Sequence, residues 1–156
     1  MATKDNSDGY CDDYPSCKRT YATLRLIHPD LDPDTVSREM TIEPSDTQRA
    51  GEPRDSGTRR PYKNSAWYLR SEGVVESRDL RRHLDWLLDR LESKSALLAG
   101  YAARGWLVDI IGVWDSAQGH GGPTLSPKQL KRLGDLGVEI WFDVYAPRGL
   151  LEDSLT

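Results

Sequence analysis

Three aspartates have the spacing that best suits chemistry in this chain. Asp109 and Asp115 lie in one apolar run and Asp143 in another. Carboxylates on neighbouring strands can bind a divalent metal or act as general acid and base. That arrangement requires the two strands to be neighbours in matched register. An ion pair of Asp109 with Arg25 or Arg70 is the simpler expectation, because a half-buried carboxylate favours a cationic partner.

Motifs of nucleophilic or phosphate-transfer chemistry are missing from the sequence: it has no Gly-x-Ser-x-Gly, no Cys with a matched His and no Walker-type Gly-Lys-Ser. His28, His83 and His120 have no ligand spacing relative to one another, so each is expected to be structural or solvated. Cys11 and Cys17 lack the paired spacing of a zinc site and are expected to be free thiols. We therefore expect no metal, no cofactor and, on balance, no enzyme.

A second candidate site combines an arginine-rich segment with a glycine loop. Residues 43–63 show no apolar pattern, and such long loops are often functional. Guanidinium groups and the backbone N–H groups of residues 119–122 suit a phosphate. Acidic residues interleave with the arginines, so nucleic acid is disfavoured. The alternative is thus a small-ligand or phosphate site built from Arg49, Gly51, Glu52, Arg54 and His120.

Length and charge place the chain in a broad class. Its 156 residues suit one domain, and its formal charge of −4 gives no overall attraction to nucleic acid. No apolar run approaches a membrane span and the N-terminus has no signal-like core, so we expect a cytoplasmic protein that does not contact a membrane. The expected organisation is a flexible tail at 1–19, a single domain at 20–146 and a second tail at 147–156.

Hydrophobic periodicity predicts strands separated by helices. Alternation predicts strands at 21–28, 65–70 and 138–145, and the glycine-bounded apolar run 105–116 predicts an inner strand covered on both faces. Caps and leucine spacing predict helices after Asp32-Pro33, after Ser77 with a break near 93–95, and after Ser126-Pro127. The expected fold is an α/β fold, specifically an α+β sandwich. We expect a ferredoxin-like split βαβ arrangement, with helices on one face of a mainly antiparallel or mixed sheet.

One face of that sheet is expected to be core and the other open. The expected core residues are Ala22, Leu24, Leu26, Trp67, Leu69, Val138, Ile140, Phe142 and Val144. The open face would carry Arg25, Tyr68, Arg70, Trp141, Asp143 and Tyr145. Trp, Tyr and Arg dominate protein interfaces, so this mixture suits another protein or self-association. A solvated sheet with cross-strand Arg–Asp pairs is the alternative. Trp86 lies opposite the leucine stripe of its helix, where it would cover a loop of its own chain or meet a partner.

Several short motifs together resemble one known family. They are Tyr21-Ala-Thr-Leu-Arg-Leu, Leu31-Asp-Pro33, Ile42-Glu-Pro-Ser-Asp46, Arg49-Ala-Gly-Glu52, Ser65-Ala-Trp67, Leu125-Ser-Pro and Leu136-Gly-Val-Glu-Ile140. Over residues 20–146 the chain resembles a bacterial family catalogued as a domain of unknown function (number 4279). The resemblance implies a small bacterial domain and supplies no catalytic residues. It singles out Pro44, Gly51, Glu52 and Trp67.

The function expected from these observations is a non-catalytic protein-binding module in a bacterial cytoplasm, of immunity or regulatory type. Small-ligand or phosphate binding through the arginine-rich and glycine loops is the alternative.

Overall fold

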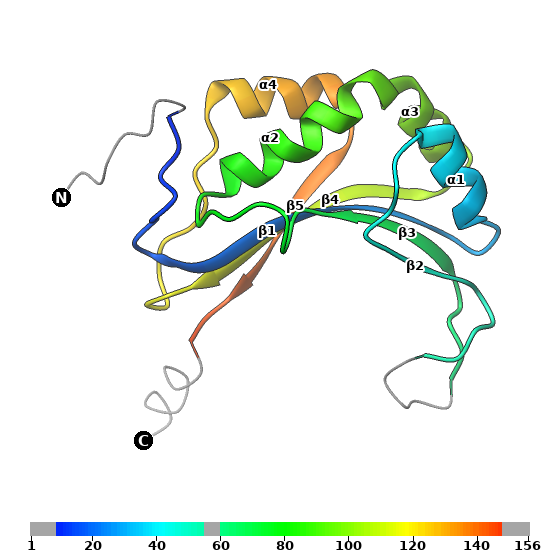
Figure 1. The fold of residues 1–156 in the computed structure, drawn as a ribbon, viewed down its shortest axis with the longest axis horizontal. Coiled ribbons are helices and arrows are strands. Elements are labelled where there is room, and N and C mark those ends of the chain that lie inside the picture. Colours follow the sequence, from blue (N-terminus) through cyan, green and yellow to red (C-terminus); the bar gives the residue numbers. More distant parts are fainter. Residues whose placement is uncertain (1–8, 55–59, 148–156) are drawn as a thin grey trace.

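The computed structural model describes residues 9–54 and 60–147. Within these residues, one sheet has the strand order β2-β3-β1-β4-β5, and the helices cover one of its faces (Figure 1). The strands are β1 (Cys17–His28), β2 (Asp46–Gln48), β3 (Ser65–Arg70), β4 (Leu107–Ser116) and β5 (Glu139–Tyr145). The helices are α1 (Pro33–Met40), α2 (Leu80–Leu91), the 3-10 turn η1 (Glu92–Lys94), α3 (Ser95–Ala103) and α4 (Pro127–Leu136). This is the predicted α+β sandwich with helices on one face.

The connections contain the predicted split βαβ unit. β1 pairs antiparallel with both β3 and β4, so β3 and β4 run parallel to each other with β1 between them. α2 and α3 connect these two strands across the helical face. β5 then pairs parallel with β4 after α4, which makes the sheet mixed. β4 is an inner strand, as its apolar run predicts, but the helices cover only one of its faces and not both as expected.

The core lies between the sheet and the helices. Its sheet side is formed by alternate residues of β1 and β3, and its helix side by the leucine stripe of α2, including Leu84 and Leu88. Trp67 is fully buried there, and its indole Nε1 donates to Ser37 Oγ of α1 at 3.0 Å. This hydrogen bond matters because a buried N–H group without an acceptor lowers the stability of the fold.

The predicted boundaries were wrong at two places near the N-terminus of the domain. β1 begins at Cys17, not Tyr21, and residues 9–16, expected in a tail, make hydrogen bonds to the start of α2. Cys17 is buried within β1, which raises the pKa of its thiol from 9.0 to about 11. Side-chain hydrogen bonds hold this segment, so it has no apolar periodicity to reveal it. Residues 1–8 and 148–156 lie outside the described residues.

Two further predictions need correction. Asp79, not Ser77, caps α2, because its carboxylate accepts the Arg81 N–H at 3.0 Å. The segment 43–63 was expected to be a long loop, but it contains β2, which pairs with β3. Residues 55–59 of that segment lie outside the described part.

Two expected core residues are not core. Ala22, Leu24, Leu26, Trp67 and Leu69 are buried as predicted, and Val138 and Ile140 pack partly buried against the core. Phe142 and Val144, however, are 38% and 58% exposed. They lie in β5 at the edge of the sheet, where the helical layer covers less of each side chain. Alternation predicted which face they occupy but not that their strand is an edge.

Gly112 marks the tightest packing against β5. A Cβ at this position would lie 3.0 Å from both Leu80 Cδ2 and Phe142 Cδ1. We expect Gly112→Ala to lower the free energy of unfolding by about 1 kcal/mol, since overpacking outweighs the gain from removing a glycine. Chemical denaturation measures this. Gly100→Ala in α3 is the control: nothing lies within 4 Å of its added methyl, so it should stabilise the helix. A Gly112→Ala protein as stable as the wild type would contradict this close packing.

Candidate functional site

The sheet face opposite the helices gathers six of the seven residues predicted for a protein interface. Arg25 in β1 lies between Tyr68 of β3 and Asp109 of β4, and Trp141 of β5 lies beside Ile111. Residues at these positions alternate with the buried ones, so they point away from the helices. The six are Arg25, Tyr68, Arg70, Trp141, Asp143 and Tyr145. We call this surface the open face.

An ion pair lies at the centre of the open face. Arg25 Nε and Nη2 donate to the two carboxylate oxygens of Asp109 at 2.9 and 2.7 Å. Trp141 Nε1 donates to Asp109 Oδ2 at 3.1 Å, and the Arg25 guanidinium carbon lies 5.3 Å from the centre of the Trp141 ring. The hydrogen bond to Asp109 raises the pKa of Arg25. Asp109 is therefore paired with Arg25, one of the two partners that the sequence left open.

The aspartates do not form the carboxylate cluster considered from the sequence. Asp109 is only 6% exposed and is occupied by Arg25 and Trp141. Asp143 accepts the Tyr145 hydroxyl at 2.7 Å, which raises the pKa of that phenol. Among residues 9–54 and 60–147, no group of three or more His, Cys, Asp or Glu residues could hold a metal ion.

A second group on the open face surrounds Tyr21. The guanidinium carbons of Arg19 and Arg70 lie 5.6 and 5.8 Å from the centre of its ring. Arg19 donates to Glu72 at 3.1 Å, and Arg70 lies 3.8 Å from the same carboxylate. The buried Nε of Arg70 has no hydrogen-bond partner in the described part of the chain. Sequence reasoning missed Arg19, which continues the alternation of β1 but was assigned to the tail.

Exposed apolar side chains concentrate in β5. Trp141 and Tyr145 are 42% and 51% exposed on the open face, and Phe142 and Val144 are exposed on the helix side. Apolar exposure on both faces of one strand is unusual for a sheet edge in contact with water.

Trp86 does not belong to the open face. It lies in α2, packs partly buried against the core, and carries the Arg90 guanidinium 4.0 Å from the centre of its ring. These contacts agree with the alternative in which Trp86 packs within its own chain, and its place at an interface stays a prediction.

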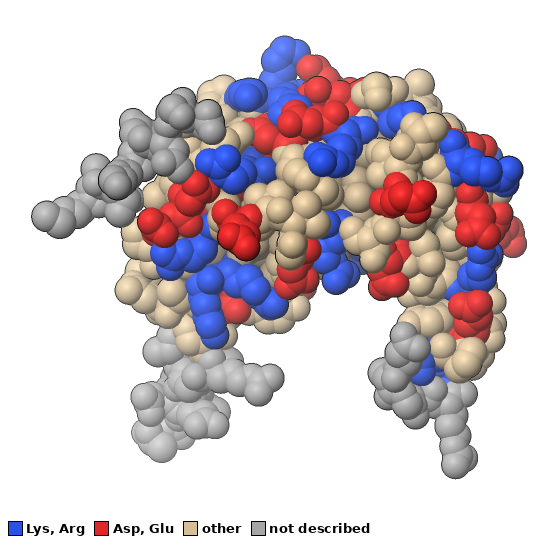
Figure 2. Space-filling view, viewed as in Figure 1, with Lys and Arg blue, Asp and Glu red and all other residues tan. Residues whose placement is uncertain are grey.

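The residues predicted for a ligand site are not brought together. Arg49 is paired with Asp32 and Asp34 at 2.9 and 2.7 Å. The Arg54 guanidinium lies over the ring of Tyr62. His120 follows the far end of β4, so its loop and the loop after β2 lie at opposite ends of the sheet (Figure 1). The side of the molecule that Figure 2 shows carries acidic and basic side chains intermixed.

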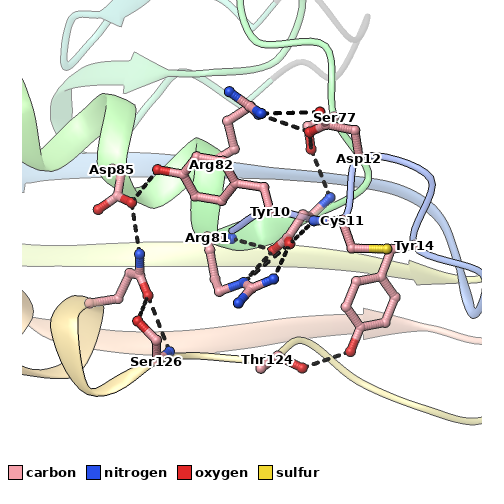
Figure 3. A network of polar contacts seen from close by, with 12 residues as sticks. Tyr10, Cys11, Asp12, Tyr14, Ser77, Arg81, Arg82, Asp85, Thr124 and Ser126 are labelled. Atoms are coloured by element: carbon pink, nitrogen blue, oxygen red, sulfur yellow. Dashed lines mark hydrogen bonds and ion pairs between the residues drawn. The ribbon is translucent and has the colours of Figure 1, made fainter. Parts of the chain in front are cut away.

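Sequence reasoning also missed a polar network on the helix side (Figure 3). Asp79, at the N-terminus of α2, accepts the backbone N–H of Cys11 at 2.7 Å, and Asp12 accepts Arg82 Nε at 2.8 Å. The Tyr10 hydroxyl donates to Asp85 Oδ2 at 2.5 Å. These contacts attach residues 10–12 to α2. The only signal in the sequence was the run of acids and tyrosines at 10–14.

The sequence of this chain matches one known protein family. A family model described as "Domain of unknown function (DUF4279)" matches residues 18–147. The chain belongs to this family. The match begins one residue inside β1 and ends just after β5, so it includes the described helices and nearly all of the sheet. No curated protein and no solved structure matches the chain. In the described residues of this DUF4279 domain, no helix is long and apolar enough to cross a membrane.

The positions singled out by the family motifs have structural roles in this DUF4279 domain. Gly51 has a φ of +85°, a conformation that favours glycine, and its N–H donates to Tyr62 O at 2.9 Å. The Tyr62 N–H donates to Glu52 O, which closes the turn. Pro44 precedes Ser45, whose hydroxyl accepts the Arg70 N–H at 2.8 Å. Gly51 and Trp67 thus have structural roles beside β2 and β3, while Pro44 and Glu52 lie next to or within the backbone hydrogen bonds of this region.

His83 has a structural role in this DUF4279 domain. It is 1% exposed, its Nε2 lies 2.9 Å from Ser77 O, and its Nδ1 lies 2.8 Å from Ser71 Oγ. A carbonyl only accepts, so Nε2 carries the proton and Nδ1 accepts the Ser71 hydroxyl. A hollow of about 400 Å³ beside it is lined by groups of both charges, including Asp12 and Arg78. Both ring nitrogens of His83 are therefore engaged by groups of its own chain.

This histidine predicts a pH dependence of stability. Burial lowers the pKa of His83 below its ordinary 6.5. Between pH 6.5 and its lowered pKa, His83 is protonated in the unfolded chain but neutral in the folded chain. The free energy of unfolding therefore decreases as the pH drops below about 6.5, by at most about 1.4 kcal/mol per pH unit. Denaturation at about pH 7.5 and pH 5.5 measures this, above the range where carboxylates titrate. The His83→Gln variant should lose most of the difference, and an unchanged slope in that variant would contradict the assignment.

Proposed function

We propose that this chain is a non-catalytic protein-binding module of immunity or regulatory type, acting in a bacterial cytoplasm, and that it binds its partner through the open face. One observation carries the proposal: Trp141 and Tyr145 are about half exposed on a sheet face that no described helix covers. Large aromatic side chains on such a face provide apolar area that a partner can bury.

The side chains of the open face are already held in position by contacts within the chain, which supports this proposal. Arg25 is held against Asp109 and the Trp141 ring, so little side-chain entropy is lost when a partner covers it. The Arg70 side chain is 40% exposed, so its guanidinium can donate to an acceptor of a partner. Arg and Trp together are typical of interface hot spots.

The small-ligand alternative has weaker support. A phosphate at Arg49 would have to displace Asp32 and Asp34, whose carboxylates already hold the guanidinium. The side-chain hydrogen bonds of Thr35 and Arg49 lower the pKa of Asp32 to about 2, so this competing charge persists in acid.

Affinity capture from extract of the source organism, followed by calorimetry with the captured partner, tests the proposal. The double variant Trp141→Ala/Tyr145→Ala should weaken binding by up to about a thousandfold, since hot-spot truncations cost about 2 kcal/mol each. Leu130→Ala, an exposed apolar residue of α4 on the opposite side, should bind as the wild type does. Equal binding by all three proteins, or no partner whose capture depends on the open face, would overturn it.

A further inference from the structure

The outer edge of β5 has no strand partner in the part of the chain that the structure describes. In the described residues β5 pairs only with β4, from Glu139 to Tyr145 without a register shift. Alternate N–H and C=O groups along its other side therefore have no strand partner. The opposite edge, β2, is only three residues long and begins with the exposed Asp46. Short, charged edges resist pairing.

β5 carries two acids, Glu139 and Asp143, but lacks the other features that commonly protect a sheet edge. Glu-Ile-Trp-Phe-Asp-Val-Tyr contains no Lys, Arg, Pro or Gly. An added strand would place a side chain beside each of its exposed apolar residues, which are Trp141 and Tyr145 on one face and Phe142 and Val144 on the other. Strand addition would thus satisfy backbone groups and bury apolar area together.

β5 is complementary to itself in one antiparallel register. Residues directly opposite in an antiparallel pair share a face, so a two-fold axis at Phe142 keeps each face matched. Phe142 then meets Phe142 of a second copy, and Ile140 meets Val144. On the open face, Asp143 meets Trp141 and Glu139 meets Tyr145, so neither acid directly opposes an acid. A parallel pairing in register would instead set Asp143 against Asp143.

We propose that two copies of this chain pair through β5 in this register, joining their five-stranded sheets into one continuous sheet. The two-fold axis is perpendicular to the sheet, so both open faces lie on the same side. The dimer presents two Arg25–Asp109–Trp141 clusters to a partner. This inference rests on the proposed function only in that both assign protein contacts to β5.

Mass measurement by light scattering across a dilution series tests the pairing. The wild-type chain should be a dimer that dissociates on dilution. Val144→Lys adds a charge to the edge and should raise the dimer dissociation constant by about thirtyfold or more. Val74→Lys is the matched control, since Val74 is 61% exposed and lies in the turn after β3. It should leave the dimer intact.

Cysteine cross-linking tests the register in a Cys11→Ser background, with Cys17 buried. Phe142→Cys should form a disulfide between copies, because directly opposite Cβ atoms lie about 5 Å apart. Val144→Cys should not, because its two copies would be about 13 Å apart along the strands. Circular dichroism confirms that each variant is folded.

A wild-type chain that is monomeric at every concentration would overturn the dimer. So would equal effects of Val144→Lys and Val74→Lys, or cross-linking of Val144→Cys without Phe142→Cys. If the chain were a monomer that still binds a partner through Trp141 and Tyr145, only the proposed dimer would be contradicted. If the chain were a dimer that binds no partner, only the proposed function would be contradicted.

Discussion

Asp109→Ala is expected to lower the free energy of unfolding by about 3 kcal/mol. Asp109 is nearly inaccessible, and its carboxylate accepts two hydrogen bonds from Arg25 and one from Trp141. Removing it leaves a half-buried guanidinium and an indole N–H without their acceptor. The remaining 23% exposure of the Arg25 side chain lets water compensate in part, which keeps the loss below that of a fully buried pair. Urea denaturation followed by tryptophan fluorescence measures the change.

Two further variants separate the charge from the packing. Asp115→Ala removes a less buried acid of the same strand and should have a small effect. Arg25→Met/Asp109→Leu replaces both charges with apolar groups and should recover most of the stability, since no unpaired charge remains. If the double variant were as unstable as Asp109→Ala, the loss would come from packing and not from an orphaned charge.

The same double variant connects stability with function. It should fold but lack the guanidinium that lies beside Trp141. Under the proposed function it should bind the partner more weakly while remaining a dimer, because β5 itself is unchanged. Fold, dimer and partner binding thus depend on different groups of one sheet.

Much of the fold could be predicted because local rules and tertiary packing agree. Asp32 followed by Pro33, and Ser126 followed by Pro127, both start helices where the cap-and-proline signal places them. The run at 105–116 forms an inner strand, as its mainly apolar residues predict. These signals depend on residues close in sequence.

The arginine that pairs with Asp109 is determined by the order of the strands in the sheet. Local sequence patterns do not predict that order. Register places Arg25 directly opposite Asp109, whereas Arg70 is opposite Thr23 in the next row of the sheet. Alternation assigned both arginines to the same face. Only the position of β1 between β3 and β4 distinguishes them.

The exposure of Phe142 and Val144 and the docking of residues 10–12 were missed for related reasons. Periodicity gives the face of a strand but not whether the strand is an edge. The N-terminal segment is held by hydrogen bonds to Asp79 and Asp85, which have no sequence period. Both features depend on contacts between residues far apart in the chain.

The most consequential of these missed residues is Asp85. Its carboxylate, 7% exposed, accepts Tyr10 Oη, Gln129 Nε2 and Arg132 Nη1. It thereby connects α2, α4 and the N-terminal segment. Gln129 is itself buried, so loss of its acceptor leaves an unsatisfied amide.

We expect Asp85→Ala to lower the free energy of unfolding by about 3 kcal/mol, because a buried amide and a largely buried guanidinium lose their shared acceptor. Arg132 keeps Asp89 and Glu92, which limits the loss. Denaturation measures the total, and faster hydrogen exchange at the Cys11 amide reports release of the segment that Tyr10 anchors. Asp89→Ala is the control: it removes an exposed carboxylate from the same arginine, so it should cost little and leave the Cys11 amide protected. Equal destabilisation by the two variants would show that Arg132, and not the buried carboxylate of Asp85, holds α2 and α4 together.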